Sequence, residues 1–542
     1  MKKILIILVI GLSILGCSED FLERYPTTSS STESFYKTPD DGEAAVTAIY
    51  NMLLRDDWWS LYIYSEIKSD NFAGGAGSGD GGGFQRIDRA LPDPANNANV
   101  EAWRIYYGAI YRANVYLDNE ANIDWSGHEN RRLQYEAEAR FLRAYFHFYL
   151  ARMFGEIPAL DHVIVDETPP RTPAEDLYDF IIQDLKFAAE NALAMKYNDV
   201  PFDHLGRTTQ WAAKAMIARV YLYYSGYYND ADIKDFTAAD ARAYIDDVVN
   251  NSGHALVPEF ASLWRVPTYS ELGGDTSLVA YAGELHDETL WSIRYIGTGT
   301  SSNWASAQFQ RMLGPRGTNQ DPYGQGWGAM PVMPTYWEAF ADDDPRRSAT
   351  ILWWEGEGKT YDFIAQQQAQ YTGYNTKKYA NSSRNGRTET GTTDWQWTSY
   401  EDYMVIRYAD VLLMGAELHL NGGNAGTALS YFNQVRERAF GDSDHNYASI
   451  TVQDILDERR LEFGGEGLRY WDILRSCKGD FSKLVPILTY VDENDGGDFS
   501  HTSDVESLDV DGNRFVETKG LFQLPQVELD LMEGAIEQNP GY

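Results

Sequence analysis

The sequence predicts an all-α fold in which a scaffold of helical hairpins carries one long irregular segment. Two observations support this prediction. Apolar residues recur every three or four positions through paired segments in both halves of the chain, which is the pattern of amphipathic helices. Between about residues 255 and 400 that pattern stops, and Gly, Ser, Asn and Pro become frequent. The number of domains stays open, because a helical array of 542 residues can be one continuous unit.

The first 16 residues have the pattern of a signal peptide. Two lysines precede an apolar run over residues 4–14, which is too short to span a bilayer as a resident helix. The sequence Ile14-Leu15-Gly16-Cys17 that follows resembles a bacterial lipobox, in which cleavage leaves the cysteine as a diacylated N-terminus. We therefore expect lipidation at Cys17, followed by a tether and N-terminal segment over residues 17–40.

Residues 41–254 are predicted to form the first part of the scaffold. Ala, Leu and aromatic residues recur there at helical spacing, and Thr172-Pro173 marks one helix start. The predicted helices span residues 42–56, 100–121, 131–153, 174–195, 209–226 and 237–250. A glycine-rich stretch after Asp70 interrupts them and is expected to be too flexible to pack. Gly77, Gly79 and Gly82 match GxGxxG formally, but no buried strand precedes them, so they do not indicate a dinucleotide site.

Residues 401–542 are predicted to complete the scaffold. A helix over residues 406–420, stopped by an Asn-Gly-Gly turn, and a second over 424–440 form a helical hairpin. A third predicted helix, 452–475, mixes many charges with apolar residues, and these charges are expected to pair with one another because unpaired charges are rarely buried. With the earlier helices this makes about four helical pairs, which resemble tetratricopeptide-like hairpins with irregular spacing.

The irregular segment 255–400 is predicted to be a loop-rich ligand-binding insertion, since loops on a rigid scaffold commonly carry binding groups. It holds nine of the 15 tryptophans: Trp264, Trp291, Trp304, Trp327, Trp337, Trp353, Trp354, Trp395 and Trp397. By contrast, Trp211 and Trp471 lie on helical stripes and are predicted to be core. A second irregular section, 490–519, is acidic without EF-hand spacing, so solvated turns are favoured over a calcium site.

Composition excludes some classes of partner. Lys and Arg number 45 against 81 Asp and Glu, and the formal net charge of −36 disfavours nucleic acid and other polyanions. Aromatic residues make up 14% of the chain, which is more than a core needs, so some are expected at a surface. Besides Cys17 the sequence has only Cys477, which excludes a disulfide framework and predicts a small buried hydrophobe there.

Several blocks, in order along the chain, resemble the SusD/RagB outer-membrane lipoproteins of Bacteroidetes. They are CSEDFLERYP, TTQWAAKAMIARVYLYYSG, RYADVLLMGAEL, FNQVRERA, ILDERRLEFGGEGLRYWDILR, LPQVELD and QNPGY. The resemblance implies a tetratricopeptide-like scaffold with an irregular insertion, anchored in the outer membrane and exposed at the cell surface. It also implies a partner, a SusC-like TonB-dependent transporter that receives glycan or, in some members, peptide.

A neutral glycan calls for flat aromatic faces against sugar C–H groups, with polar side chains for the hydroxyls. We predict Trp304, Tyr323 and Trp327 as platforms, because each lies beside Gly, Ser, Asn or Asp and not on a helical stripe. The predicted polar contacts are Asp70, Asn71 and Arg86. Should these tryptophans be core, the surface is expected near Trp58, Trp59 and the glycine-rich loop.

Two other functions stay open. An acidic surface also suits basic peptides, as in a RagB-like protein that captures peptide. A secreted glycoside hydrolase is the rival class, but with 81 acidic residues a carboxylate pair carries no weight. The sequence has no HExxH zinc motif, no GxSxG nucleophile elbow and no complete P-loop. We therefore expect a binding protein without a cofactor or metal, and no enzyme.

Overall fold

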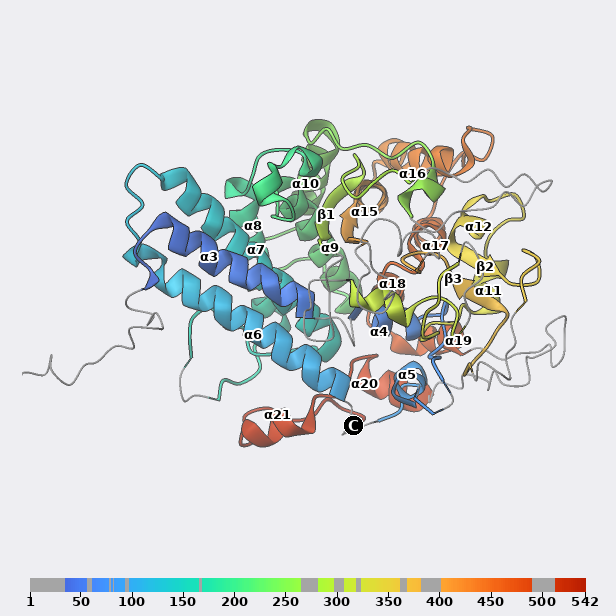
Figure 1. Cartoon of the computed structure of the whole chain (residues 1–542), viewed down its shortest axis with the longest axis horizontal. Helices are drawn as coiled ribbons and strands as arrows, with labels where there is room; N and C mark the ends of the chain where they lie inside the picture. Colours follow the sequence, from blue (N-terminus) through green and yellow to red (C-terminus); the bar gives the residue numbers. More distant parts are fainter. Residues whose placement is uncertain are drawn as a thin grey trace, which may run out of the picture.

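The computed structural model describes residues 35–55, 61–77, 79–80, 82–92, 97–164, 168–264, 281–296, 307–317, 323–360, 368–381, 401–489 and 512–542. Helices dominate this part of the chain, and the short strands in it form two-stranded antiparallel sheets (Figure 1). The prediction of a mostly helical protein is confirmed, while the tetratricopeptide-like arrangement stays a prediction. Within these ranges no helix combines the length and apolar character that crossing a membrane requires.

The predicted helices of the first half are present, with ends that differ by a few residues. Local signals set several of these ends: Thr38 with Asp41, and Thr237 with Asp240, form capping boxes that satisfy the first free N–H groups of their helices. The elements are α3 (Pro39–Tyr50), η2 (Asn51–Arg55), α4 (Leu61–Ile67), α5 (Gly82–Asp88), α6 (Asn97–Asn119), α7 (Glu129–Phe154), α8 (Ala174–Asn191), α9 (Gln210–Tyr227) and α10 (Ala238–Asn251).

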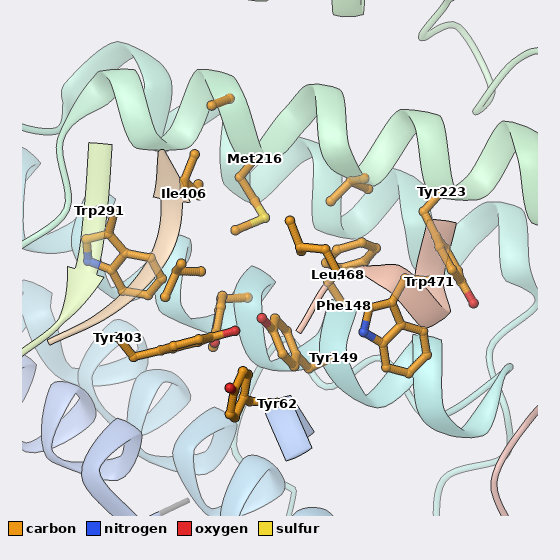
Figure 2. Packing of buried hydrophobic residues seen from close by; sticks show 14 of the residues in the cluster. Tyr62, Phe148, Tyr149, Met216, Tyr223, Trp291, Tyr403, Ile406, Leu468 and Trp471 are labelled. Carbon is orange, nitrogen blue, oxygen red and sulfur yellow. The ribbon is translucent and has the colours of Figure 1, made fainter. Parts of the chain in front are cut away.

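The core runs along α7 and α9, which are enclosed by other elements. α7 packs against α6 and α8, and α9 packs against α8 and α10. Because nearly every face of α9 is buried, its sequence is apolar all round and holds tightly packed aromatic rings. Figure 2 shows Met216 and Tyr223 of α9 facing Phe148 and Tyr149 of α7. Trp211 and Trp471 are 7% and 3% exposed, which confirms the prediction that both are core.

The second half holds shorter helices: η8 (Phe481–Leu484), α15 (Tyr408–Asn421), α16 (Ala425–Phe440), α17 (Val452–Phe463), α18 (Arg469–Ser476), α19 (Val485–Leu488), α20 (Gly512–Thr518) and α21 (Gln526–Leu531). The hairpin of α15 and α16 is as predicted, and Cys477 is buried at 1% exposure, as expected. The predicted helix start at Ile406 is wrong, because β4 (Tyr403–Arg407) pairs antiparallel with β1 (Thr289–Ile293). All residues of both strands are buried, so neither shows the alternation by which a strand is recognised.

The prediction of one helix over residues 452–475 is also wrong. The chain breaks between α17 and α18, where Gly465 and Gly467 have φ values of +83° and +79°. Only glycine adopts this backbone at little cost. A Cβ on Gly464 would lie 2.0 Å from the Tyr336 hydroxyl. The turn directs Glu466 inward, where its carboxylate accepts hydrogen bonds from Lys378 Nζ at 2.8 Å and Arg407 Nε at 2.7 Å.

Most charges of residues 452–475 are paired, but the prediction that they pair with one another is correct only for Asp472 with Arg459 and Arg475, and the other partners lie elsewhere in the chain. One set, called here the Glu462 network, consists of Arg346, Lys378, Arg407 and Arg438 with Glu288, Asp344, Glu458, Glu462 and Glu466. A second, the Asp410 network, consists of Arg219, Arg459 and Arg475 with Asp410, Glu417 and Asp472. All of these side chains are at least nine-tenths buried. The Asp410 network joins α9, α15, α17 and α18 to one another, and the Glu462 network joins α17 to α12, α16 and β4.

Within 255–400 no described element is longer than five residues. The elements are η6 (Phe260–Leu263), β1, η7 (Gln308–Met312), α11 (Pro334–Glu338), α12 (Arg346–Thr350), β2 (Ile351–Trp353) and β3 (Tyr374–Thr376). β2 pairs antiparallel with β3, and Figure 1 shows both beside α11 and α12 at one end of the molecule. The boundaries of the insertion stay a prediction.

The expectation that the glycine-rich stretch does not pack is wrong for the glycine segment, defined here as Phe72–Gly77. Every residue in it is buried. Its backbone N–H groups at Ala73 and Gly75 donate to the carbonyls of Pro331 and Ala329, both at 2.9 Å. A Cβ on Gly75 would lie 2.4 Å from the carbonyl oxygen of Gly328. The glycines therefore permit close contact between two backbones and do not make a flexible loop.

Candidate functional site

Some predicted residues lie outside the described part of the chain. These are the lipidation site Cys17, the platform Trp304, the pair Trp58 and Trp59, and most of the acidic section, residues 490–511. Among the described residues, no group of His, Cys, Asp and Glu has the arrangement of a metal site.

Asp70 and Asn71 join two distant parts of the chain. The Asp70 carboxylate accepts from Arg469 Nε at 2.7 Å and Nη2 at 2.8 Å, and Asn71 Oδ1 accepts from Arg460 Nε at 2.7 Å. Burial raises the pKa of Asp70, but the charges of Arg469 and Arg460 outweigh it and hold the pKa below its usual value. Both side chains thus join the segment after α4 to α17 and α18, and their predicted contact with ligand stays a prediction.

Tyr323 is not a surface platform. Its side chain is 2% exposed and packs in a small cluster with Leu352, Trp354 and Tyr371. Its hydroxyl donates a short hydrogen bond to the carboxylate of Glu357. The prediction that its ring faces ligand fails here because loop residues flank it in sequence, whereas the pairing of β2 with β3 builds a core around it.

Trp327 lies half-buried at the edge of the glycine segment. The Arg311 guanidinium lies 5.0 Å from the centre of its ring, and Arg316 donates to the Trp327 carbonyl at 3.3 Å. Arg316 also forms an ion pair with Asp80 at 2.8 Å, just before α5. The predicted contact Arg86 is exposed on α5, where its Nη2 donates to the Pro92 carbonyl at 2.7 Å. One aromatic face thus lies beside arginine and carboxylate groups, an arrangement we call the Trp327 surface.

A second aromatic surface was not selected from the sequence. We call it the Trp337 cluster, and it consists of Trp337 on α11, Trp353 on β2, Tyr374 on β3 and Arg347 on α12. The ring centres of Trp337 and Trp353 are 5.4 Å apart, and Trp337 stacks on Tyr374 at 5.2 Å with an interplanar angle of 24°. The Arg347 guanidinium lies 4.6 Å from the Trp337 ring centre. Both tryptophans are half-buried.

The strand register explains why this cluster was missed. Trp353 is directly opposite Tyr374 in the β2–β3 pair, and nothing in the local sequence indicates that these strands meet. Gly356 follows in the turn, where a Cβ would lie 2.0 Å from the Trp353 ring. The only indication in the sequence was the high tryptophan content of residues 255–400. This content does not show which of the tryptophans are partly exposed in the folded protein. Both surfaces combine a half-buried tryptophan with an arginine that lies over its ring, and this combination of aromatic and hydrogen-bonding groups can bind a ligand having apolar faces and hydroxyls.

Comparison with known proteins gives consistent matches over most of the chain. A family model described as "SusD family" matches residues 287–542, and one described as "Starch-binding associating with outer membrane" matches residues 20–222. Neither description names an enzymatic activity.

Two related sequences and one solved structure illustrate the similarity. The chain is 28% identical over 512 residues to SusD-like protein P2 of Formosa agariphila, covering 89% of this chain and 92% of the relative. It is 27% identical over 505 residues to a SusD-like protein of Bacteroides ovatus, covering 87% and 82%. Its fold is similar to surface glycan-binding protein A from Bacteroides fluxus, with a TM-score of 0.75, 25% identity, and coverage of 93% of this chain and 100% of that one.

Proposed function

Because this chain belongs to the SusD/RagB family of Bacteroidetes, we propose that it is a non-catalytic glycan-binding protein of the outer membrane. It captures poly- or oligosaccharide at the cell surface, is held there by a lipid on Cys17, and delivers its ligand to a SusC-like TonB-dependent transporter. Support comes from the family description that names starch binding and outer-membrane association, and from the glycan-binding protein of B. fluxus with a similar fold.

The observation that carries the proposal is the pair of half-buried tryptophan surfaces on the irregular segment. Aromatic rings bind the apolar C–H faces of sugars, and arginine and carboxylate groups bind the hydroxyls with directed hydrogen bonds. The Trp327 surface supplies Arg316 and Asp80 at its edge, and the Trp337 cluster supplies Arg347. We assign ligand contact to Trp327, Trp337 and Trp353, and keep the predicted contacts Arg86 and Trp304.

A glycan array run beside a peptide library tests the ligand class. We expect binding to a neutral glycan and none to basic peptides, and the bound glycan should be recovered uncut. Selective binding of peptides would support the RagB-like alternative, which the net charge of −36 favours. New reducing ends that appear with time, and disappear when one Asp or Glu is replaced, would identify a hydrolase.

Replacing Trp327, Trp337 or Trp353 with Ala tests the location of the site. We expect at least one of the two surfaces to lose about 1 to 3 kcal/mol of binding free energy, the scale of a well-packed aromatic contact. Isothermal titration calorimetry with the glycan found on the array measures this loss. Tyr111→Ala is the matched control, because this aromatic is 55% exposed on α6, away from both surfaces. Unchanged affinity in all three variants, with a lower melting temperature, would mean that these tryptophans only pack the segment.

Cys17→Ala tests the anchor. Acylation of this cysteine is the proposed attachment to the membrane, so the variant should be folded and should leave the membrane fraction. Cell fractionation with an immunoblot measures the distribution, and mass spectrometry of the N-terminus shows whether the signal peptide was cleaved. A processed variant that stays with the membranes would contradict the lipoprotein assignment.

A further inference from the structure

A small cavity lies between α7, α9, α15, α17 and α18, within the helical core. Its volume is about 20 Å³, which is enough for one water-sized particle. It is lined by Phe148, Arg152, Arg219, Leu222, Tyr223, Met414, Arg459, Leu468, Trp471, Asp472 and Arg475. Each of these residues is at most 8% exposed. Figure 2 shows four of the lining side chains, those of Phe148, Tyr223, Leu468 and Trp471, gathered between α7, α9 and α18.

The polar atoms of this cavity include several hydrogen-bond donors without a protein acceptor. Arg152 Nε and Nη2, Arg219 Nε and Nη1, Trp471 Nε1 and the Tyr223 hydroxyl are buried, and none has an acceptor among the described residues. Arginine and tryptophan nitrogens can only donate. Because native proteins rarely leave buried donors unpaired, four such side chains around one cavity indicate a ligand that accepts hydrogen bonds.

Around the cavity, the positively charged side chains that the structure describes outnumber the negatively charged ones by one. The Asp410 network balances three arginines with three carboxylates, at N···O distances of 2.5 to 2.8 Å. The carboxylate that lines the cavity, Asp472, is held by Arg459 and Arg475. Arg152 is an additional cation, and it contacts aromatic rings instead of a carboxylate: its guanidinium lies 4.4, 4.2 and 4.6 Å from the ring centres of Phe148, Tyr149 and Trp471. Among the described residues one positive charge is therefore uncompensated, which is costly in a buried site.

We propose that this cavity binds a small monovalent anion of the halide class, chloride under physiological conditions. The positive charge of Arg152 excludes a cation, and one uncompensated positive charge balances a monovalent anion and not the two charges of a sulfate or hydrogen phosphate. A water molecule offers two acceptor sites and no charge, so it would leave most donors and the charge unsatisfied, whereas a halide accepts from several directions. The ion joins Arg152 of α7 to Arg219 and Tyr223 of α9 and to Trp471 of α18, and so stabilises the scaffold that carries the insertion.

Thermal unfolding in defined salts tests the proposal on the whole protein. Chloride or bromide replaces gluconate at constant ionic strength, and we expect the melting temperature to rise and then saturate, because an ion that binds only the folded state stabilises it by mass action. Sulfate at the same ionic strength should give no saturable rise. Crystals soaked in bromide should show an anomalous scattering peak in the cavity.

Two variants assign the effect to this site. Arg152→Met keeps an apolar stem against Phe148 and Tyr149 but removes the charge, and it should abolish the saturable response to halide. Tyr223→Phe removes one donor and should weaken the apparent affinity several-fold. Arg143→Met is the control: Arg143 is also buried on α7, but it pairs with Asp184 and does not line the cavity, so its variant should keep the halide response.

The absence of a bromide peak in the wild-type crystal, together with equal stability in chloride and gluconate, would overturn the proposal and assign the cavity to water. A halide response that persists in Arg152→Met would overturn it as well.

Discussion

The Glu462 network and the region under the glycine segment, where Asp88 of α5 accepts from the Gly74 N–H, both bury carboxyl groups, but the pKa values of these groups shift in opposite directions. Burial acts on Glu462, yet Arg438, Arg407 and Arg346 together hold its pKa far below the usual value. Burial raises the pKa of Asp88, whose Oδ2 accepts from the Gly74 N–H at 2.8 Å, to about 7. The two groups are comparably buried, so burial alone does not decide the charge.

The difference lies in the cations that touch each carboxylate. Three arginines contact Glu462. Near Asp88, the charges of Arg89 and Lys68 lower the pKa of the carboxyl by less than burial raises it. The buried ammonium of Lys68 lies over the rings of Tyr470 and Phe522, at 5.2 and 4.9 Å, and burial lowers its own pKa to about 8. Glu462 therefore stays ionised at ordinary pH values, whereas Asp88 titrates near neutrality. We therefore expect Glu462 to add no pH dependence to the stability near neutrality, and Asp88, which accepts from the Gly74 N–H of the glycine segment, to add one.

Removing one arginine from the Glu462 network should give the largest loss of stability among these predictions. Arg407→Met leaves three carboxylates of the Glu462 network without a main partner, and we expect the free energy of unfolding to fall by about 3 to 5 kcal/mol. Urea unfolding followed by circular dichroism measures the change. The control is Arg104→Met, which removes an ion pair with Glu528 from an arginine that is 53% exposed and should cost about 0.2 to 1 kcal/mol. If both variants lost the same free energy of unfolding, burial would not determine how much an ion pair matters for stability.

Removing the Asp88 carboxyl should change how the free energy of unfolding depends on pH. In the folded protein the pKa of Asp88 is raised to about 7, and the unfolded value is about 4, so the folded state binds the proton more tightly. This contribution to stability is present at low pH and is lost as the pH rises from about 4 to about 7. Asp88→Asn keeps an acceptor for Gly74, so its stability relative to the wild type should increase by about 1 to 4 kcal/mol across that window.

Urea unfolding at several pH values measures this difference. The buried His147 and His254, with pKa values lowered by burial to about 3 and about 4, destabilise both proteins as the pH falls below about 6.5, and their effect cancels in the comparison. The exposed control Asp203→Asn should follow the wild-type profile. Parallel profiles for Asp88→Asn and the wild type would show that this carboxyl is ionised in the folded protein.

A substitution in the glycine segment is expected to lower the stability by a smaller amount. Gly75→Ala places a methyl group 2.4 Å from the Gly328 carbonyl oxygen and 2.5 Å from Pro331 Cδ, so the two backbones must separate. We expect a loss of roughly 1 to 3 kcal/mol in the free energy of unfolding. Gly79→Ala is the matched control, because a Cβ there has open space around it. Differential scanning calorimetry compares the two, and equal melting temperatures would restore the prediction of a loose loop.

Local chemistry explains why the helices could be predicted. The boundaries of α8, α9 and α10 follow from Pro173, from the Thr209 cap and from the Thr237–Asp240 capping box, all within a few positions of the helix they start. Helical periodicity also placed Trp211 and Trp471 in the core. The density of charge in 452–475 predicted ion pairs, but most of the partners lie outside the segment and not within it as predicted.

The candidate site could be predicted only in part, because exposure depends on distant neighbours. The Trp-rich segment contains Trp327, which lies half-buried, and its contact with glycan stays a prediction. Tyr323 has the same kind of sequence neighbours but is enclosed by the β2–β3 pair. Trp337 and Trp353 become one surface only when those strands meet.

The sequence by itself determined the helical class, most helix boundaries, the burial of Cys477 and the family, because caps, periodicity and motifs act over a few residues. Tertiary structure alone decided which side chains meet. Asp70 and Arg469 are 399 positions apart, and the strand at Tyr403–Arg407 exists because β1 lies opposite it. Likewise, Arg152 is one arginine among many in the sequence, and only the packing of α7 against α9 and α18 leaves its charge facing a cavity. Long-range contacts leave no local pattern, since either partner alone is compatible with many environments.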